Sequence, residues 1–318
     1  MATPFRIVFM GTPEFAVPTL KSLTSNKDLV KLIAVYTQPD RPAGRGQKPT
    51  ASPIKLIAQE FGLPLYQPER IKSPEEARKL ADLMCDLVVV VAFSQIFNPG
   101  ILNIPRLGFL NVHASLLPKY RGAAPIQYAL LNGEKETGIS IIKLIPKMDA
   151  GPLLHQKAIP IQDGTTSQML YNELAILGSE TIIETLKLIQ EKKLIETVQN
   201  EHHASYAPKI KKEDGLIHWN KTGLEILRQI HAFSNWPGTF TNSTKGILKI
   251  HKAKGYSNLI GAPSHIKPGE IFISSGAFFV KCRDGWLELI SIQMEGKKTV
   301  SSNEFLNGLQ KDDELKFI

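Results

Sequence analysis

Short apolar runs alternate with amphipathic stretches over the first two hundred residues. The runs span 5–10, 31–37, 86–93 and 108–115. Continuous apolar runs of this length are typical of strands that are covered on both faces of a sheet. The alternation with helical patterns therefore predicts an α/β fold with a doubly wound, mostly parallel, Rossmann-like sheet. Ligands of such sheets bind beyond the carboxyl ends of the strands.

Helix signals separate these runs. Ser52-Pro53 and Ser73-Pro74 each place an N-cap serine before a proline, which predicts helices that begin at 53 and 74. Glu76 stands at the position that would complete a capping box with Ser73. A long helical pattern follows over 165–193 and ends the first predicted domain, residues 1–193.

The pattern changes after this helix. Residues 194–208 have weak periodicity and predict a linker. In the second domain, 209–318, one amphipathic helix is predicted over 221–233, and only short strands follow it. The pair Asp284-Gly285 between two alternating runs predicts a hairpin turn. This arrangement indicates a small β-barrel, for which we favour the OB type.

Composition adds limits on location and partners. No run of 18 apolar residues occurs, so no membrane helix is expected. The first residues enter a strand pattern without the features of a signal peptide, and Cys85 and Cys282 lack metal-ligand or disulfide-framework spacing. We therefore expect a cytoplasmic protein, and a monomer. The net charge of +8 favours a polyanionic partner, although many small-molecule enzymes are equally basic.

The first strand ends in a motif that argues against one cofactor. The stretch "MGTPEFA" has Gly11 but no second glycine where a dinucleotide enzyme carries its glycine-rich turn. We therefore expect no NAD. The sequence likewise offers no metal-ligand cluster, and no metal is expected.

A basic segment follows the second strand. Residues 37–53, "TQPDRPAGRGQKPTASP", contain four prolines, two glycines and the cations Arg41, Arg45 and Lys48. Loops of this length in a compact domain are usually functional or disordered. The segment is interpreted as a lid that contacts phosphates, and a solvated surface loop remains an equal alternative.

Two polar residues interrupt the run 108–115. Asn111 and His113 stand two positions apart and therefore share one face of the predicted strand. An amide donor beside an imidazole suits a reaction in which a carbonyl oxygen gains negative charge. Asp149, after the strand predicted at 137–145, is the candidate to orient His113. A structural histidine and an ordinary Asp-Ala-Gly turn are the alternatives.

These residues lie in a recognisable set of motifs. "NVHASLLPKYRGAAPIQ" together with "MDAGPLL" resembles the folate-dependent formyltransferase family, and "GTPEFA", "TQPDRPAGRG" and "HAFSNWPGTF" extend the resemblance to nearly the whole chain. The resemblance implies transfer of a formyl group from 10-formyltetrahydrofolate, a co-substrate, to the α-amino group of methionyl initiator tRNA. It also implies catalytic roles for Asn111, His113 and Asp149.

The same resemblance suggests two sets of binding residues. The folate would contact two short stretches: Val91, Ala92, Phe93, Ser94, Gln95, Ile96, Ser115, Leu116, Leu117 and Pro118. The tRNA would contact cations: Arg41, Arg45, Lys48, Arg121, Lys209, Lys211 and Lys212. The chain departs from the family pattern at Ser94, where a glycine is usual.

The expected chemistry is direct attack of the amine on the formyl carbon, with Asn111 and His113 stabilising the oxyanion. Two other functions remain open. A formyltransferase for an amino-sugar nucleotide or for glycinamide ribonucleotide would share these three residues but would not need the basic segment and the barrel. A non-enzymatic RNA-binding protein would have no use for an Asn-x-His pair at a strand end.

Overall fold

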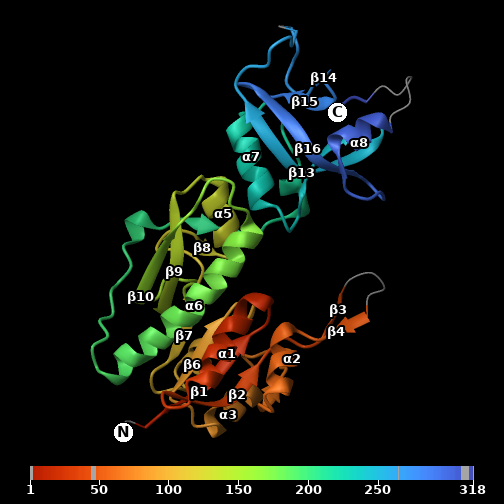
Figure 1. Ribbon diagram of the computed structural model, residues 1–318. Coiled ribbons are helices and arrows are strands. Elements are labelled where there is room, and N and C mark those ends of the chain that lie inside the picture. Colours follow the sequence, from red (N-terminus) through yellow and green to blue (C-terminus); the bar gives the residue numbers. More distant parts are fainter. Residues whose placement is uncertain (1–2, 44–47, 264, 309–314, 318) are drawn as a thin grey trace. The chain divides into compact units, whose positions relative to one another are not determined.

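The computed structural model describes residues 3–43, 48–263, 265–308 and 315–317 (Figure 1). They form two compact units. The first comprises the chain up to Pro125 together with Glu136–Ile161 and Tyr171–Ala207. The second comprises Ile126–Lys135, Gln162–Leu170 and the chain from Pro208 onwards. Residues 194–207, expected from the sequence to be a linker, thus fall within the first unit.

The first unit contains the expected alternation of strands and helices. Its strands are β1 (Phe5–Gly11), β2 (Val30–Tyr36), β3 (Arg41–Ala43), β4 (Lys48–Thr50), β5 (Leu65–Tyr66), β6 (Leu87–Val91), β7 (Phe109–His113), β8 (Arg121–Gly122), β9 (Glu136–Lys143), β10 (Leu153–Pro160) and β11 (Tyr206–Ala207). Its helices are η1 (Glu14–Ala16), α1 (Val17–Ser25), α2 (Pro53–Glu60), α3 (Pro74–Asp82), α4 (Pro99–Leu102), most of α6 (Ser167–Gln190) and η2 (Glu201–His203).

The main sheet has the strand order β10-β9-β7-β6-β1-β2-β5. The pairs from β7 to β5 are parallel, whereas β9 and β10 pair antiparallel at one edge. The predicted mostly parallel Rossmann-like sheet is therefore confirmed. In this antiparallel edge, β9 runs beside β7 and leads into the turn that carries Asp149.

The helix starts follow the serine–proline signals. Ser52 Oγ accepts a hydrogen bond from Lys55 N at 3.0 Å, and Ser73 Oγ accepts one from Glu76 N at 3.2 Å. The predicted capping box is wrong in one respect. The carboxylate of Glu76 pairs with Lys79, 2.9 Å away, rather than returning to the Ser73 backbone. A lysine three residues on offers the carboxylate a charged partner on the same helix face.

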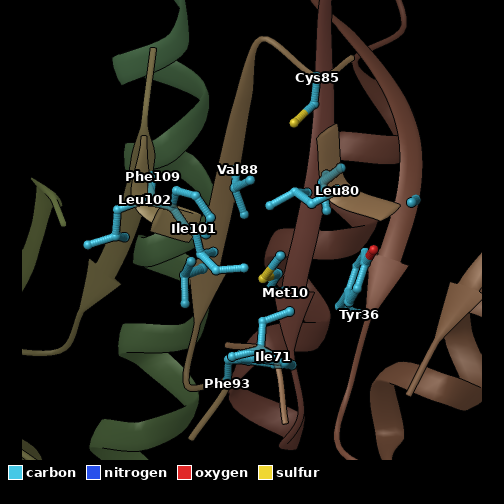
Figure 2. Close-up of a cluster of buried hydrophobic side chains, with 13 residues drawn as sticks. Met10, Tyr36, Ile71, Leu80, Cys85, Val88, Phe93, Ile101, Leu102 and Phe109 are labelled. Atoms are coloured by element: carbon cyan, nitrogen blue, oxygen red, sulfur yellow. The ribbon is translucent and has the colours of Figure 1, made fainter. Parts of the chain in front are cut away.

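One face of the sheet carries a closely packed core (Figure 2). Met10 of β1, Val88 of β6 and Phe109 of β7 pack there against Leu80 of α3 and Ile101 of α4. Because side chains alternate along a strand, Asn111 and His113 project to the same face as Phe109. The core face of β7 therefore continues directly into the polar residues at the strand's carboxyl end.

Helix α6 packs on the opposite face of β7. A Cβ at Gly178 would lie 2.9 Å from Val112 Cγ1 and 3.6 Å from Ile139 Cδ1. The absence of a side chain at Gly178 thus lets the helix approach β7 and β9 closely.

The basic segment 37–53 is more structured than expected. Its arms form an antiparallel pair, β3 with β4, in which Arg41 faces Thr50 and Ala43 faces Lys48. The base is closed by a 2.7 Å hydrogen bond between the Thr37 and Ser52 hydroxyls. The predicted long loop thus has paired arms, in which antiparallel pairing satisfies backbone groups. The composition of the segment alone does not reveal this pairing.

The second unit is built mainly from antiparallel strands. Its strands are β12 (Thr239–Ser243), β13 (Gly246–Tyr256), β14 (Ile271–Ser274), β15 (Ala277–Lys281), β16 (Trp286–Met294) and β17 (Val300–Ser301). Its helices include most of α5 (Pro125–Leu131), η3 (Lys212–Gly215), α7 (Gly223–Ala232) and α8 (Ser302–Asn307). The strand order is β12-β13-β16-β15-β14, with β17 paired to β16. The antiparallel domain is confirmed, whereas its OB type stays a prediction.

The hairpin between β15 and β16 forms one residue earlier than expected. Lys281 pairs with Trp286, and Cys282 N donates to Gly285 O at 3.0 Å, so Arg283 and Asp284 occupy the turn. Gly285 serves a different purpose. A Cβ there would lie 2.3 Å from the carbonyl oxygen of Tyr256.

Within the described residues, no helix has the length and apolar character needed to cross a membrane.

Candidate active site

The two predicted polar residues lie at the carboxyl end of strand β7, in the interior of the sheet. Asn111 lies between β6 and β9, opposite Val90 and Ile142, and His113 is paired with Ser140. Asn111 is half-buried and His113 is 6% exposed. Among the described residues, none forms a hydrogen bond with the side-chain amide of Asn111. Its donors are thus available to a bound molecule.

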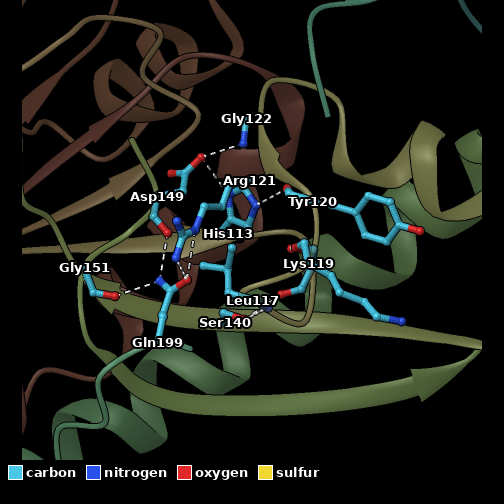
Figure 3. Close-up of polar contacts among 11 residues, drawn as sticks. His113, Leu117, Lys119, Tyr120, Arg121, Gly122, Ser140, Asp149, Gly151 and Gln199 are labelled. Carbon is cyan, nitrogen blue, oxygen red and sulfur yellow. Dashed lines mark hydrogen bonds and ion pairs between the residues drawn. The ribbon is translucent and has the colours of Figure 1, made fainter. Parts of the chain in front are cut away.

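The ring of His113 is held from one side. Its Nε2 lies 2.9 Å from the carbonyl oxygen of Tyr120 (Figure 3). A carbonyl oxygen only accepts hydrogen bonds, so Nε2 carries a proton in this arrangement. In the neutral ring Nδ1 is consequently the unprotonated nitrogen. Any proton that His113 takes up is therefore received on Nδ1.

Asp149 faces that nitrogen. Its Oδ2 lies 3.7 Å from Nδ1 of His113 and accepts a 2.8 Å hydrogen bond from the backbone N–H of Gly122. The side chain of Asp149 is 14% exposed. A carboxylate fixed at this position stabilises positive charge on the imidazole electrostatically. The structure therefore brings Asp149 and His113 together, as the sequence predicted.

The "SLLP" stretch after β7 is held by two residues that the sequence did not single out. Ser140 donates to the carbonyl oxygen of Ser115 at 2.6 Å and accepts from Leu117 N at 3.0 Å. Gln156 donates to Ser140 Oγ and to the carbonyl oxygen of Leu117. Ser140 lies on β9 and Gln156 on β10, and neither position carries a sequence signal of a role near a site.

The ten predicted folate-contacting residues differ in accessibility. Ala92, Ser94 and Ile96 are exposed, whereas Val91, Phe93 and Ser115 have 1% or less of their surface exposed. Ser115 Oγ donates to the carbonyl oxygen of Lys119. The buried residues can only support a binding surface from behind. Leu117 is also buried, and Gln95, Leu116 and Pro118 are half-buried.

Both ends of the Gln95 amide are engaged: the oxygen accepts from Ile71 N and the nitrogen donates to the carbonyl oxygen of Pro68. Ser94 has φ +63°, a conformation that favours glycine. The departure from the family pattern at this position thus places a side chain on a left-handed backbone.

The side chain of Arg121 is not accessible, contrary to the prediction from the sequence. We expected it to be accessible to tRNA, but its side chain is fully buried. Its guanidinium donates to Gln199 and to both carboxylate oxygens of Glu201. A guanidinium with these partners is not open to a phosphate, so the prediction is wrong for this structure. The partners come from 194–208, which the sequence indicated as a linker because it lacks periodicity.

The structure describes some of the other residues that were predicted to contact tRNA. Arg41 is exposed and pairs with Glu69. Arg45 lies outside the described residues, and the backbone of Lys48 begins β4. In the second unit, Lys209, Lys211 and Lys212 are all exposed.

Comparisons with known proteins identify the class. The formyl transferase family matches residues 5–186, and the formyl transferase C-terminal domain matches residues 209–310. Among solved structures, a sugar 3N-formyl transferase, WlaRD, superposes with a TM-score of 0.65 at 21% identity, over 93% of this chain and 100% of that one. HypX from Aquifex aeolicus, solved with tetrahydrofolic acid, superposes with a TM-score of 0.63 at 18% identity, over 99% of this chain and 50% of that one. The fold and these matches define a formyl-transferring enzyme.

Relatives with higher sequence identity show to which family within this class the chain belongs. A methionyl-tRNA formyltransferase of Geobacter sulfurreducens is 42% identical over 306 residues, which are 96% of this chain and 94% of the relative. One of Methylococcus capsulatus is 43% identical over 302 residues, 95% of this chain and 96% of the relative. The chain therefore belongs to the methionyl-tRNA formyltransferase family.

Proposed function

We propose that this enzyme transfers the formyl group of 10-formyltetrahydrofolate to the α-amino group of methionyl initiator tRNA, by direct attack of the amine on the formyl carbon. One observation carries the proposal. Strand β7 presents the unoccupied amide of Asn111 on the same face as His113, whose Nδ1 faces the anchored carboxylate of Asp149. Membership of the methionyl-tRNA formyltransferase family supports the choice of acceptor.

Asn111 supplies the oxyanion donor. As the amine bonds to the formyl carbon, the formyl oxygen gains negative charge, and a pre-placed amide N–H stabilises it. The amide needs no rearrangement to do so, because it has no other partner among the described residues.

His113 moves the proton. A free α-amino group has a pKa of about 7.7–8.0, so a useful neutral fraction attacks at pH 7 without a strong base. The ammonium formed by attack must lose a proton before the leaving nitrogen of the donor gains one. His113 accepts it on Nδ1, beside Asp149, since Nε2 is bonded to the carbonyl oxygen of Tyr120. The protonated ring helps Asn111 to stabilise the oxyanion and then gives this proton to the leaving nitrogen N10 of the donor as the bond from the formyl carbon to N10 breaks, which releases neutral tetrahydrofolate.

The binding surfaces follow from accessibility. We place the folate along the exposed Ala92, Ser94 and Ile96, supported by the "SLLP" stretch. We place the tRNA on the exposed lysines 209, 211 and 212 and on the basic segment 37–53. Such contacts position a nucleic acid without reading its sequence. The second domain, 209–318, is thus assigned to tRNA binding. We further propose a cytoplasmic monomer, as its tRNA substrate and the sequence suggest.

A single-turnover assay tests this function. Labelled 10-formyltetrahydrofolate and methionine-charged initiator tRNA are mixed with excess enzyme, and label in the aminoacyl ester is followed. We expect rapid transfer by the wild type and little by His113→Ala. A wild-type enzyme that transfers the label to an amino-sugar nucleotide but not to the tRNA would overturn the acceptor while leaving the site. Undiminished transfer by His113→Ala would overturn the site.

A further inference from the structure

We propose that Gln199 is a positioning residue, which holds the Asp149 carboxylate in place toward His113. The inference rests on the proposed role of Asp149. Gln199 lies between the bridge that Thr197 makes with Leu153 and the short helix η2, in a stretch with no helical or strand pattern. It is nevertheless only 5% exposed.

The amide nitrogen of Gln199 holds the turn that carries Asp149. It donates to the carbonyl oxygen of Asp149 at 2.8 Å and to that of Gly151 at 2.7 Å (Figure 3). Both protons of the amide are therefore used on one turn. Asp149 itself has φ +47°, a left-handed conformation that is uncommon in residues other than glycine and that aspartate adopts more readily than most. Gln199 supplies two hydrogen bonds to the turn in this conformation.

The amide oxygen fixes the orientation of the same group. It accepts from Nε of Arg121 at 3.1 Å and from Nη2 at 2.8 Å. A flipped amide would turn its oxygen toward two carbonyl oxygens and its nitrogen toward a guanidinium, so only one orientation is compatible with these partners. Arg121 is itself locked by Glu201.

The two supports of Asp149 meet in neighbouring residues. Gln199 holds the backbone of Asp149, and Gly122, next to Arg121, holds its side chain. Arg121 and Gly122 form β8, which pairs with Tyr206 and Ala207 of β11. Residues 199–207 thus connect both supports. A displacement of about 1 Å in a catalytic group can cost about 10²-fold in rate.

Two substitutions separate the functions of the amide. Gln199→Met removes all of its hydrogen bonds, whereas Gln199→Glu keeps an acceptor for Arg121 but loses the donors to the turn. Gln229→Met is the matched control. Gln229 is equally buried, at 5% exposed, and its amide donates to the carbonyl oxygens of Asp214 and Leu216 at 2.8 and 3.0 Å in the second unit.

The experiment measures the single-turnover rate at saturating donor and tRNA, together with KM for each, in these variants with and without Asp149→Asn. We expect both Gln199 variants to lower the rate about 10–10²-fold with KM nearly unchanged. In the Asp149→Asn background they should cost little more, because residues that act through one another are not additive. Gln229→Met should lose thermal stability but keep its rate. If Gln199→Met does not fold, Gln199→Glu carries the test.

The outcomes distinguish the inference from the proposed function. A wild-type rate in the Gln199 variants, a full further loss in the Asp149→Asn background, or an equal loss in Gln229→Met would each overturn the positioning role alone. A wild-type rate in Asp149→Asn would overturn the proposed role of Asp149, and the inference with it.

Discussion

Oδ2 of Asp149 accepts a hydrogen bond from the backbone nitrogen of Gly122, 2.8 Å away, and the same oxygen faces Nδ1 of His113. The carboxylate that faces the imidazole is therefore held by a backbone group. Gly122 has φ +118°, and a Cβ there would lie 2.7 Å from the carbonyl oxygen of Ala207.

Gly122→Ala tests this anchor. The added methyl group must displace β8 from β11, which moves the N–H that holds Asp149. We expect the free energy of unfolding to fall by about 1–3 kcal/mol and the single-turnover rate to fall at least about 10-fold. Gly62→Ala is the control, since Gly62 has φ +61° with nothing within 4 Å of the added atom. It should lose some stability and no rate; an unchanged rate in Gly122→Ala would contradict the anchoring role.

Asn111→Ala should affect the rate of transfer and leave the stability of the protein nearly unchanged. Because the amide has no partner among the described residues, its removal should alter the thermal midpoint little. The loss of an oxyanion donor should lower the single-turnover rate about 10²–10³-fold. Rate and melting curves measured on the same preparation check both statements. A large drop in stability with a small drop in rate would show that the amide is structural.

Ser94 offers a test of backbone strain beside the proposed folate surface. With φ +63°, a β-branched residue is disfavoured there and glycine is not. We expect Ser94→Val to lower the free energy of unfolding by about 1–2 kcal/mol, and Ser94→Gly to be neutral or slightly stabilising. Denaturant titrations measure both. Equal stability of the two variants would contradict the left-handed conformation.

The ionisation of Glu201 should make the stability of the folded protein depend on pH in the acidic range. Its hydrogen bonds to Arg121 first, and then to Lys147, lower the pKa of the carboxyl from 4.5 to about 2. A lowered pKa in the folded state means that the carboxylate contributes stability above about pH 4.5, and that this contribution is lost as the pH falls toward 2. The difference in thermal midpoint between wild type and Glu201→Gln should therefore shrink across that window. A difference independent of pH would contradict the pairing.

The lysines at the start of the second unit should set part of the salt dependence of tRNA binding. Replacing Lys209, Lys211 and Lys212 together by alanine should weaken binding. The slope of log K against log salt should become shallower by roughly 1 for each phosphate that a lysine no longer neutralises. Replacing the exposed Lys21, Lys27 and Lys31 of the first unit is the matched control for net charge. Equal changes in slope for the two triple variants would show that only total charge matters.

Local patterns in the sequence determined much of the secondary structure. Apolar runs placed β1, β2, β6 and β7, and the serine–proline signals placed the starts of α2 and α3. Spacing of two along β7 also put Asn111 and His113 on one face, because side-chain direction in a strand depends only on position. The motifs indicated the formyltransferase family, to which the chain belongs.

Tertiary structure alone decided how the site is supported. Burial of Arg121 depends on Gln199 and Glu201, which lie 78 and 80 positions further along the chain. Gln199 in turn bonds to carbonyl groups 50 and 48 positions away. Such interactions leave no periodic trace in the sequence, because a hydrogen-bonding side chain in irregular backbone satisfies whatever groups the fold brings near it. A stretch that the sequence indicated as a linker thus supports the turn that carries Asp149, through hydrogen bonds that only the folded chain provides.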